Sequence, residues 1–252
     1  MEPSDPDSTR RFTDRARAYA QFRPSYPAAA IDAMLAGLPA PERIVAADVG
    51  AGTGIATRLL AARGVRVLAV EPNAAMRAAA VPHPLVQWRA GTAAATGIDA
   101  ACVDLVLVAQ AFHWFDPPDT LREFQRILAR PGRLAIMWNR RSRQDPFTLG
   151  YRTALEVMDA EAPAERSQFD SAVVAAGGRF TDLQTHVVRN AQALTLDELL
   201  GRAQSTSTVP QAGPRWDALA QMLRALHASH ASPDGRATMV YDTEVYVWAA
   251  CG

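Results

Sequence analysis

The chain has 252 residues, of which 49% are hydrophobic and 21% charged, a composition typical of a folded protein rather than a disordered one. Its 26 basic and 26 acidic residues cancel, so it lacks the positive excess that nucleic-acid binding usually requires, and because every basic residue is arginine, lysine-based covalent chemistry is excluded. We therefore expect one domain over residues 1–252 that acts without nucleic acid.

Cysteine and histidine usage gives no sign of a disulfide framework or a metal site. Cys102 and Cys251 lie far apart in the sequence, which favours a reducing compartment. The first residues lack the apolar core of a signal peptide, and no apolar stretch reaches the roughly 20 residues of a membrane helix. We expect a cytoplasmic protein with no membrane partner and no metal. Four histidines without ligand spacing are expected at the surface: His83, His186, His227 and His230.

The N-terminal part of the chain predicts two amphipathic helices between Phe12 and Leu38. Apolar residues recur at helical spacing on both sides of the sequence RPSYP, whose two prolines interrupt the pattern. We expect residues 12–38 to form a helical cap over the main body.

Residues 44–140 alternate between short apolar runs and helical stretches. The runs are IVAADV, VRVLAV, LVQWRA, VDLVLV and RLAIMWN, and segments such as TRLLAARG and DTLREFQRILAR separate them. This is the pattern of repeated βαβ units around a parallel sheet. We expect this part to form the ligand-binding core.

Residues 141–252 have a different pattern. Helical stretches are predicted near 151–160, 195–205 and 216–229, mixed with the alternating segments THVVRNAQAL and TMVYDTEVYVWAA. We expect those two segments to pair as an antiparallel hairpin at one edge of the sheet. The helices of this part are expected on the side of the acceptor.

The strongest functional signal is the segment AADVGAGTGIATRLL. An apolar strand ends near Asp48 and is followed by Gly50, Gly52 and Gly54 before a helical stretch. Glycine permits tight turns and a close approach of ligand to backbone. Dinucleotide-binding dehydrogenases use a similar loop, but their third glycine would fall at Ile55. Asp48 also favours a ligand with an ammonium group over a pyrophosphate, through a direct or water-mediated contact.

An acidic residue follows the next predicted strand, in the segment VLAVEPNAAM. At this position Glu71 can accept hydrogen bonds from both hydroxyls of a ribose, a role shared by dinucleotide and adenosylmethionine sites. Glu71 thus indicates a nucleoside but does not indicate the reaction.

Five segments occur in the order DVGAGTG, VEPN, GTAA, VDLVLVAQAFHWF and RILARPGRLAIMWN. In this order they resemble class I S-adenosylmethionine-dependent methyltransferases. The segment RFTDRARAYAQFRPSYP is similar to the N-terminal motif of the branch that contains trans-aconitate-type small-molecule methyltransferases. The resemblance implies S-adenosyl-L-methionine as cofactor. It also implies a Rossmann-like α/β fold: a mostly parallel seven-stranded sheet with an antiparallel edge hairpin, helices on both faces and an N-terminal helical cap.

The resemblance implies contacts along the whole length of the cofactor. The glycine loop would line the methionine part and Glu71 the ribose. The residues after Glu71 and the GTAA segment would meet the adenine, the AQAF segment would lie beside the sulfonium, and two residues of the N-terminal motif would close over the carboxylate. The implied residues are Tyr19, Arg23, Asp48, Gly50, Ala51, Gly52, Gly54, Glu71, Pro72, Met76, Gly91, Thr92, Ala93, Gln110, Ala111 and Phe112.

Several side chains have both a functional and a structural interpretation. His113 follows a strand at the edge where open α/β folds bind ligands, so it is a candidate general base, although it could also order the loop by packing. Trp114 and Phe115 could wall the acceptor pocket or belong to the core. Met76 could contact adenine or fill the core. Tyr26 is a second candidate for contact with the substrate.

The sequence leaves the reaction partly open. Members of the resembled family commonly carry an acid just after the GxA motif, whereas this chain reads GTAAATG. The favoured hypothesis is methyl transfer to an oxygen, nitrogen or carbon of a small-molecule acceptor in secondary metabolism. The alternative is an adenosylmethionine-binding cyclase or sensor that transfers no methyl group. The segment WNRRSRQD either meets an anionic acceptor or forms a solvated loop.

Overall fold

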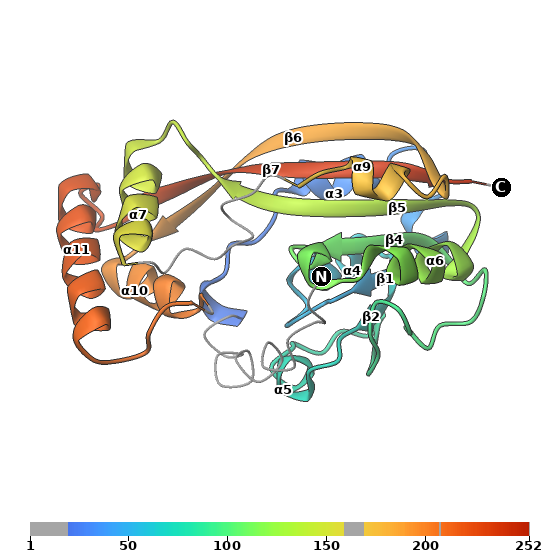
Figure 1. Ribbon diagram of the computed structural model, residues 1–252, viewed down its shortest axis with the longest axis horizontal. Coiled ribbons are helices and arrows are strands. Elements are labelled where there is room, and N and C mark those ends of the chain that lie inside the picture. Colours follow the sequence, from blue (N-terminus) through green and yellow to red (C-terminus); the bar gives the residue numbers. More distant parts are fainter. Residues whose placement is uncertain (1–19, 159–168, 207, 252) are drawn as a thin grey trace.

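The computed structural model describes residues 20–158, 169–206 and 208–251. Within these residues seven strands form one sheet in the order β3-β2-β1-β4-β5-β7-β6. Strands β1 to β5 run parallel, whereas β7 is antiparallel to both β5 and β6, as Figure 1 shows. This confirms the expected α/β fold with an antiparallel hairpin at one edge. The strands are β1 (Val45–Val49), β2 (Arg66–Val70), β3 (Val86–Arg89), β4 (Val103–Ala109), β5 (Leu128–Arg141), β6 (Phe180–Leu194) and β7 (Ala237–Ala250).

The central strands are apolar because helices cover both faces of the sheet. On one face, α3 (Ala28–Leu35) and α4 (Ile55–Ala61) pack against β1, β2, β4, β5 and β7. On the other face, α6 (Pro117–Ile127) and α9 (Ala172–Ala175) enclose a second core that includes Trp138, Tyr246 and Trp248. The short helices α5 (Ala74–Ala78), η1 (Pro41–Arg43) and η2 (Phe112–Trp114) lie in the connections.

A third hydrophobic cluster lies beyond the parallel part of the sheet. Three helices, α7 (Pro146–Val157), α10 (Leu196–Gln204) and α11 (Pro214–His230), pack around ends of β6 and β7. In Figure 1 they stand at the left, where the long strands β5, β6 and β7 extend past the rest of the sheet. The three predicted C-terminal helices are therefore present. The division into cap, cofactor core and acceptor side stays a prediction.

The helix predicted over DTLREFQRILAR ends earlier than its sequence pattern suggests. Helix α6 stops at Ile127, and Leu128 begins β5, where it pairs with Val103 of β4. Pro131 disfavours helical geometry at the residue before it. Residues 128–130, expected as helix, are therefore strand. Of the predicted N-terminal cap, residues 12–19 lie outside the described residues, Ala20–Phe22 are helical, and α3 forms the second helix.

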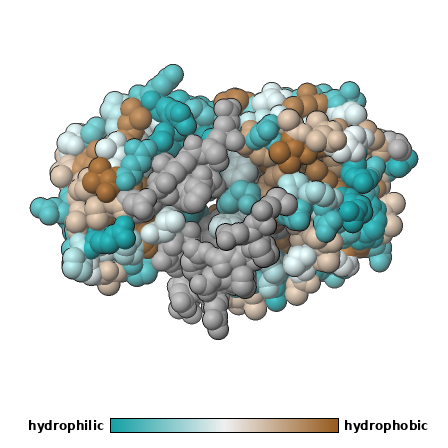
Figure 2. Space-filling model, in the orientation of Figure 1, coloured by the Kyte–Doolittle hydropathy of each residue, from teal (hydrophilic) through white to brown (hydrophobic). Residues whose placement is uncertain are grey.

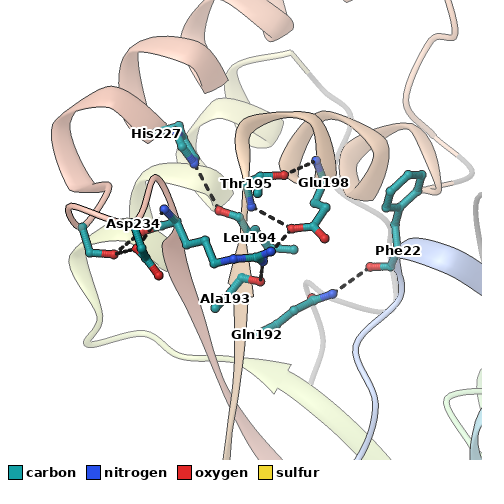
Figure 3. Close-up of polar contacts among 10 residues, drawn as sticks. Phe22, Gln192, Ala193, Leu194, Thr195, Glu198, His227 and Asp234 are labelled. Carbon is teal, nitrogen blue, oxygen red and sulfur yellow. Dashed lines mark hydrogen bonds and ion pairs between the residues drawn. The ribbon is translucent and has the colours of Figure 1, made fainter.

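One histidine expected at the surface is buried. His227 of α11 is 7% exposed, and its Nε2 lies 3.1 Å from the carbonyl oxygen of Leu194, to which it donates a hydrogen bond. Leu194 ends β6, so this bond ties the hairpin to α11, as Figure 3 shows. The expectation for His227 was wrong because its place on α11 is set by packing between helices, which sequence spacing does not report.

The surface mixes polar and apolar residues. Hydrophilic and hydrophobic residues are intermixed at both ends of the face drawn in Figure 2. The large apolar side chains that are exposed are spread over several parts of the fold, among them Val81, Val157 and Val187, and scattered exposures of this kind are ordinary. Across the described chain no helix combines the length and apolar character that a membrane crossing needs.

Candidate functional site

The glycine loop leaves the sheet at the carboxyl end of β1, between two neighbouring strands. Gly50, Gly52 and Gly54 all have positive φ, at 72°, 58° and 78°, a conformation that side chains with a Cβ rarely adopt. The amides of Gly50 and Ala51 both donate to the carbonyl oxygen of Val70 at the end of β2, at 2.9 and 3.1 Å. The loop is thereby held at the sheet edge where ligands of open α/β folds bind.

Gly50 also has no room for a side chain. A Cβ on this residue would lie 2.7 Å from Cβ of Ala111 and 3.0 Å from Cζ of Phe115. Both neighbours follow β4, so the glycine loop packs directly on the segment that the sequence predicts beside the sulfonium. This contact brings two predicted parts of the cofactor site together. It also gives Phe115 a structural position under the loop.

Glu71 connects the glycine loop to the turn after β2. Its Oε2 accepts a hydrogen bond from the amide of Gly52, and its Oε1 accepts one from the amide of Asn73, both at 2.9 Å. The side chain is 8% exposed. Burial raises the pKa of Glu71, while the two amides and the nearby Arg77 lower it. Each carboxylate oxygen keeps a second lone pair, so the geometry is compatible with the predicted ribose contact.

Asp48 is completely buried beneath the loop. Its Oδ2 accepts a hydrogen bond from Oγ1 of Thr57 at 2.5 Å, and its Oδ1 has no hydrogen-bond partner among the described residues. Burial raises its pKa to about 6, with Thr57 opposing the shift and the charge of Glu71 adding to it. Full burial fits the water-mediated one of the two routes predicted for an ammonium contact, and that contact stays a prediction.

The residues predicted around adenine lie in two connections. In the first, Pro72 is exposed and Met76 is buried, and the side chain of Asn73 caps α5 by accepting from the amides of Ala75 and Met76. The 5% exposure of Met76 is compatible with either of its interpretations.

In the second connection, Thr92 is exposed and Ala93 is buried, and an isolated bridge between Thr92 and Ala95 closes a small turn. A Cβ on Gly91 would lie 3.0 Å from the carbonyl oxygen of Thr96. The turn is therefore tightly packed at its glycine and open at Thr92.

An acid that sequence reasoning missed stabilises this second connection. Glu123 of α6 accepts from the amide and the hydroxyl of Thr96, at 3.0 and 2.6 Å, through the same oxygen. The hydrogen bond from Arg126 is the main reason that its pKa falls to about 2. Although the segment GTAAATG lacks an acid of its own, a carboxylate from α6 reaches it. Glu123 lies on α6, 27 residues beyond Thr96, so no local sequence motif predicts this contact.

The segment after β4 contributes the residues predicted beside the sulfonium. Gln110 has a positive φ of 58°, and its amide donates to the carbonyl oxygen of Met137 at 2.9 Å. Ala111 and Phe112 are buried, at 8% and 5% exposure. A non-glycine residue with positive φ at a ligand-binding edge is typical of a functional turn.

His113 is exposed at the surface of this segment. Its ring centroid lies 4.5 Å from that of Trp114 and 5.5 Å from that of Trp138 on β5. Its exposure is compatible with a role as general base, and its aromatic contacts are compatible with a role in ordering the loop. Both interpretations of His113 therefore stay open. Trp114 is 44% exposed, which is more than a core residue shows.

The predicted N-terminal contacts are only partly described. Tyr19 lies outside the described residues. Nη2 of Arg23 donates to the carbonyl oxygen of Ser205, at the end of α10, at 3.1 Å. Tyr26 is partly buried against the core that contains α3 and α4. Their contacts with cofactor and substrate stay predictions.

A cleft of about 530 Å³ opens beside the carboxyl end of β5. It lies next to the segment after β4, because Nε2 of Gln110 donates to the carbonyl oxygen of Asn139 at 3.2 Å and Asn139 directly precedes the lining residue Arg140. Its volume is in the range of small-molecule sites. Four of the residues that line this cleft belong to the segment WNRRSRQD, which is a candidate from the sequence for contact with an anionic acceptor.

Comparisons with known proteins give the family. Residues 47–136 match the model of a methyltransferase domain. An uncharacterised methyltransferase of Mycobacterium tuberculosis is 37% identical over 211 residues, which cover 82% of this chain and 81% of the relative. This chain belongs to the methyltransferases. An uncharacterised methyltransferase-like protein of Schizosaccharomyces pombe is 31% identical over 183 residues, covering 72% of this methyltransferase and 71% of the relative.

Solved structures agree with the family. A candidate type II methyltransferase of Anaeromyxobacter dehalogenans is 29% identical, with a TM-score of 0.71, and the match covers 90% of this methyltransferase and 97% of that chain. The geranyl diphosphate C-methyltransferase of Streptomyces coelicolor, at 14% identity and a TM-score of 0.55, covers the whole of both chains and shows the fold alone.

The protein is therefore an enzyme of the S-adenosylmethionine-dependent methyltransferase class, as the sequence predicts. The dehydrogenase alternative for the glycine loop is wrong. The narrower assignment to the trans-aconitate-type branch stays a prediction.

Proposed function

We propose that this methyltransferase transfers the methyl group of S-adenosyl-L-methionine to a small-molecule acceptor. The observation that carries the proposal is the presence of two features at the carboxyl ends of the parallel strands: the carboxylate of Glu71 after β2, held by the amides of Gly52 and Asn73, and a cleft of about 530 Å³ beside the end of β5. The first suits the ribose of the cofactor. The second suits a small molecule rather than a macromolecule.

The residues present fit the cofactor. The unpartnered, buried Oδ1 of Asp48 suits the ammonium group of the methionine part through a bridging water, and the remaining lone pairs of Glu71 suit the ribose hydroxyls. When bound, S-adenosylmethionine supplies a methyl carbon attached to a positively charged sulfur. The protein's task is to hold an acceptor against that carbon and to exclude water.

The transfer itself is a single displacement. A lone pair on the acceptor forms the new bond to the methyl carbon while the carbon–sulfur bond breaks, and the electrons of that bond return to sulfur. A hydroxyl or amine acceptor also loses a proton, either to solvent or to His113, whose exposed ring belongs to the segment after β4. Positioning alone can supply much of the acceleration, so His113 is an optional base.

Calorimetry with S-adenosylhomocysteine tests the cofactor half of the proposal. We expect binding by the wild type and a loss of about ten-fold or more in affinity for Glu71→Gln, because an amide cannot accept hydrogen bonds from both Gly52 and Asn73. The matched control is Glu42→Gln, at an exposed position, which should bind as the wild type does. No binding by the folded wild type would refute the proposal.

Mass spectrometry of reactions with S-adenosylmethionine tests the transfer half. A product heavier by one methylene unit, formed together with S-adenosylhomocysteine, supports a methyltransferase with a small acceptor. If the cofactor binds but no methylated product forms over a broad panel of small acceptors, the cyclase or sensor alternative replaces the proposal.

A further inference from the structure

The cleft beside β5 has a strongly cationic wall. Five of its lining residues are arginines from three parts of the fold: the end of β5 with the turn after it (Arg140, Arg141 and Arg143), α7 (Arg152) and β6 (Arg189). Two carboxylates, those of Asp242 and Glu244 on β7, also line it. The lining residues therefore carry three more positive than negative charges, on a chain whose formal net charge is zero. One of the five arginines, Arg152, is also paired with Glu156 of α7 at 3.1 Å, so the excess rests mainly on the arginines of β5, β6 and the turn after β5.

Strand register places part of this charge on one face of the sheet. Asp242 of β7 is paired with Arg140 on one side and with Arg189 on the other, and directly paired residues point to the same face. Two residues further along β7, Glu244 is paired in the same way with Trp138 of β5 and Val187 of β6. Arg140 and Arg189, called the cationic row below, therefore lie on the same face of the sheet as Trp138.

The ion pair between Arg189 and Asp242 in this wall is weak enough to give way to a ligand. Nη1 of Arg189 lies 3.3 Å from Oδ1 of Asp242, with 57% and 40% of the two side chains exposed, and exposed pairs of this kind are weak. Glu244 accepts a hydrogen bond from the hydroxyl of Tyr246 at 3.0 Å. The guanidinium of Arg141 stacks over the ring of Tyr151, 5.0 Å from its centroid. This stacking fixes one cation at the wall.

The row lies close to the predicted position of the reacting atoms. Arg140 is two residues beyond Trp138, a rise of about 7 Å along a strand, and the ring of His113 lies 5.5 Å from that of Trp138. Gln110, at the predicted sulfonium end, hydrogen-bonds to the residue just before Arg140. Arg140 and His113 therefore both lie near Trp138, on one face of the sheet.

We propose that this cleft selects an acceptor with an oxyanion group, a carboxylate or a phosphate ester, and holds that group while the nucleophilic atom faces the segment after β4. Guanidinium groups bind both oxyanions through paired N–H donors. This inference rests on the proposed function, because it names the substrate class of the same site.

Binding of citrate and of inorganic phosphate, measured by calorimetry with saturating S-adenosylhomocysteine at constant ionic strength, tests the charge of the cleft. The double variant Arg143→Gln/Arg189→Gln should weaken binding of at least one anion ten-fold or more. The control Arg224→Gln, at an exposed position on α11, should leave it unchanged. Affinity for S-adenosylhomocysteine and the midpoint of thermal unfolding should be the same in all three proteins.

A panel of acceptors decides whether the cleft selects the substrate. It should contain small carboxylic acids, their amides, phosphate esters and the parent alcohols, each incubated with S-adenosylmethionine and followed by mass spectrometry. We expect methylation of acids or phosphate esters, with the neutral partner at least ten-fold slower, and a rise in KM for the double variant. Whether the carboxylic acids or the phosphate esters are methylated shows which of the two oxyanions the cleft selects.

The outcomes separate this inference from the proposed function. Methyl transfer to neutral partners at equal rates, or equal losses in Arg224→Gln and the double variant, would overturn the inference and leave the function standing. Failure to bind either anion at all would also overturn it. No binding of S-adenosylhomocysteine would instead remove the proposed function on which it rests.

Discussion

Asp48 has an unusual environment for a carboxylate, since it is fully buried and its one described partner is a hydroxyl. Burial raises its pKa from 3.8 to about 6. Between these values the folded protein holds a proton that the unfolded chain has lost. The contribution of Asp48 to stability therefore falls as pH rises through this window. Keeping an ionised acid here at neutral pH costs folding free energy, which is typical of residues retained for binding.

We predict that Asp48→Asn stabilises the protein more at high pH than at low pH. Asparagine can still accept the hydrogen bond from Thr57 but carries no charge to bury. The gain in free energy of unfolding over the wild type should grow by about 1 kcal/mol between pH 5 and pH 8. Urea unfolding at the two pH values measures it, with Asp217→Asn, exposed on α11, as control. An equal gain at both values would contradict the assignment.

At the scale of elements, the first and last residues of strand β5 were set by pairing with strands that are distant in sequence. The run RLAIMWN predicts a strand of ordinary length, but β5 extends from Leu128 to Arg141. Its first residue pairs with Val103 of β4, and residues 133–141 pair with residues 241–249 of β7. This extension carries Arg140 and Arg141 to the cleft. Periodicity located the strand, and pairing set its length.

Helix α10 has a start signal that is visible in the sequence. Thr195 and Glu198 form a capping box: the hydroxyl of Thr195 accepts from the amide of Glu198, and Oε2 of Glu198 accepts from the amide of Thr195, at 3.3 and 2.8 Å, as Figure 3 shows. Arg236 pairs with the same carboxylate at 2.9 Å. The box orients α10 directly after β6.

We predict that Thr195→Ala lowers the free energy of unfolding by about 1 kcal/mol, because the amide of Glu198 loses its acceptor. Ser171→Ala is the matched control, since Ser171 occupies the same capping position of α9 without a side-chain hydrogen bond. Urea titrations of both variants give the comparison. Equal losses in the two would show that the capping box contributes nothing measurable.

At the scale of the whole molecule, the segment before α3 joins the sheet to α10. The carbonyl oxygen of Ser25 accepts from Nδ2 of Asn139 and Asn190, at 3.1 and 2.8 Å, and that of Phe22 accepts from Nε2 of Gln192 at 3.0 Å. The ring of Phe22 lies against Gly201 of α10. The N-terminal segment thus couples the parallel core to the C-terminal helices.

We predict opposite effects of Gly201→Ala in two backgrounds. A Cβ on Gly201 would lie 2.5 Å from Cε2 of Phe22, so the substitution should destabilise the wild type. In Phe22→Ala the clash is gone, and alanine should stabilise the helix by about 1 kcal/mol. Urea unfolding of the four proteins yields the coupling free energy. A stabilising effect in both backgrounds would mean that the Phe22 ring does not restrain α10.

The sequence by itself determined the order of strands and helices, the antiparallel hairpin, the glycine loop with Glu71 and the family. These depend on local periodicity and on spacing within one connection, which the chain carries in linear form. It also pointed to the segments after β4 and β5, because parallel strands end at one edge.

Tertiary structure decided what those residues contact. It buried Asp48 and His227, used Glu123 of α6 for a connection that lacks an acid of its own, and placed Arg189 of β6 in line with Arg140 of β5. Each of these depends on residues that are far apart along the chain and meet only when helices and strands pack. Burial and long-range pairing are properties of the packed fold, so no local pattern in the sequence reports them.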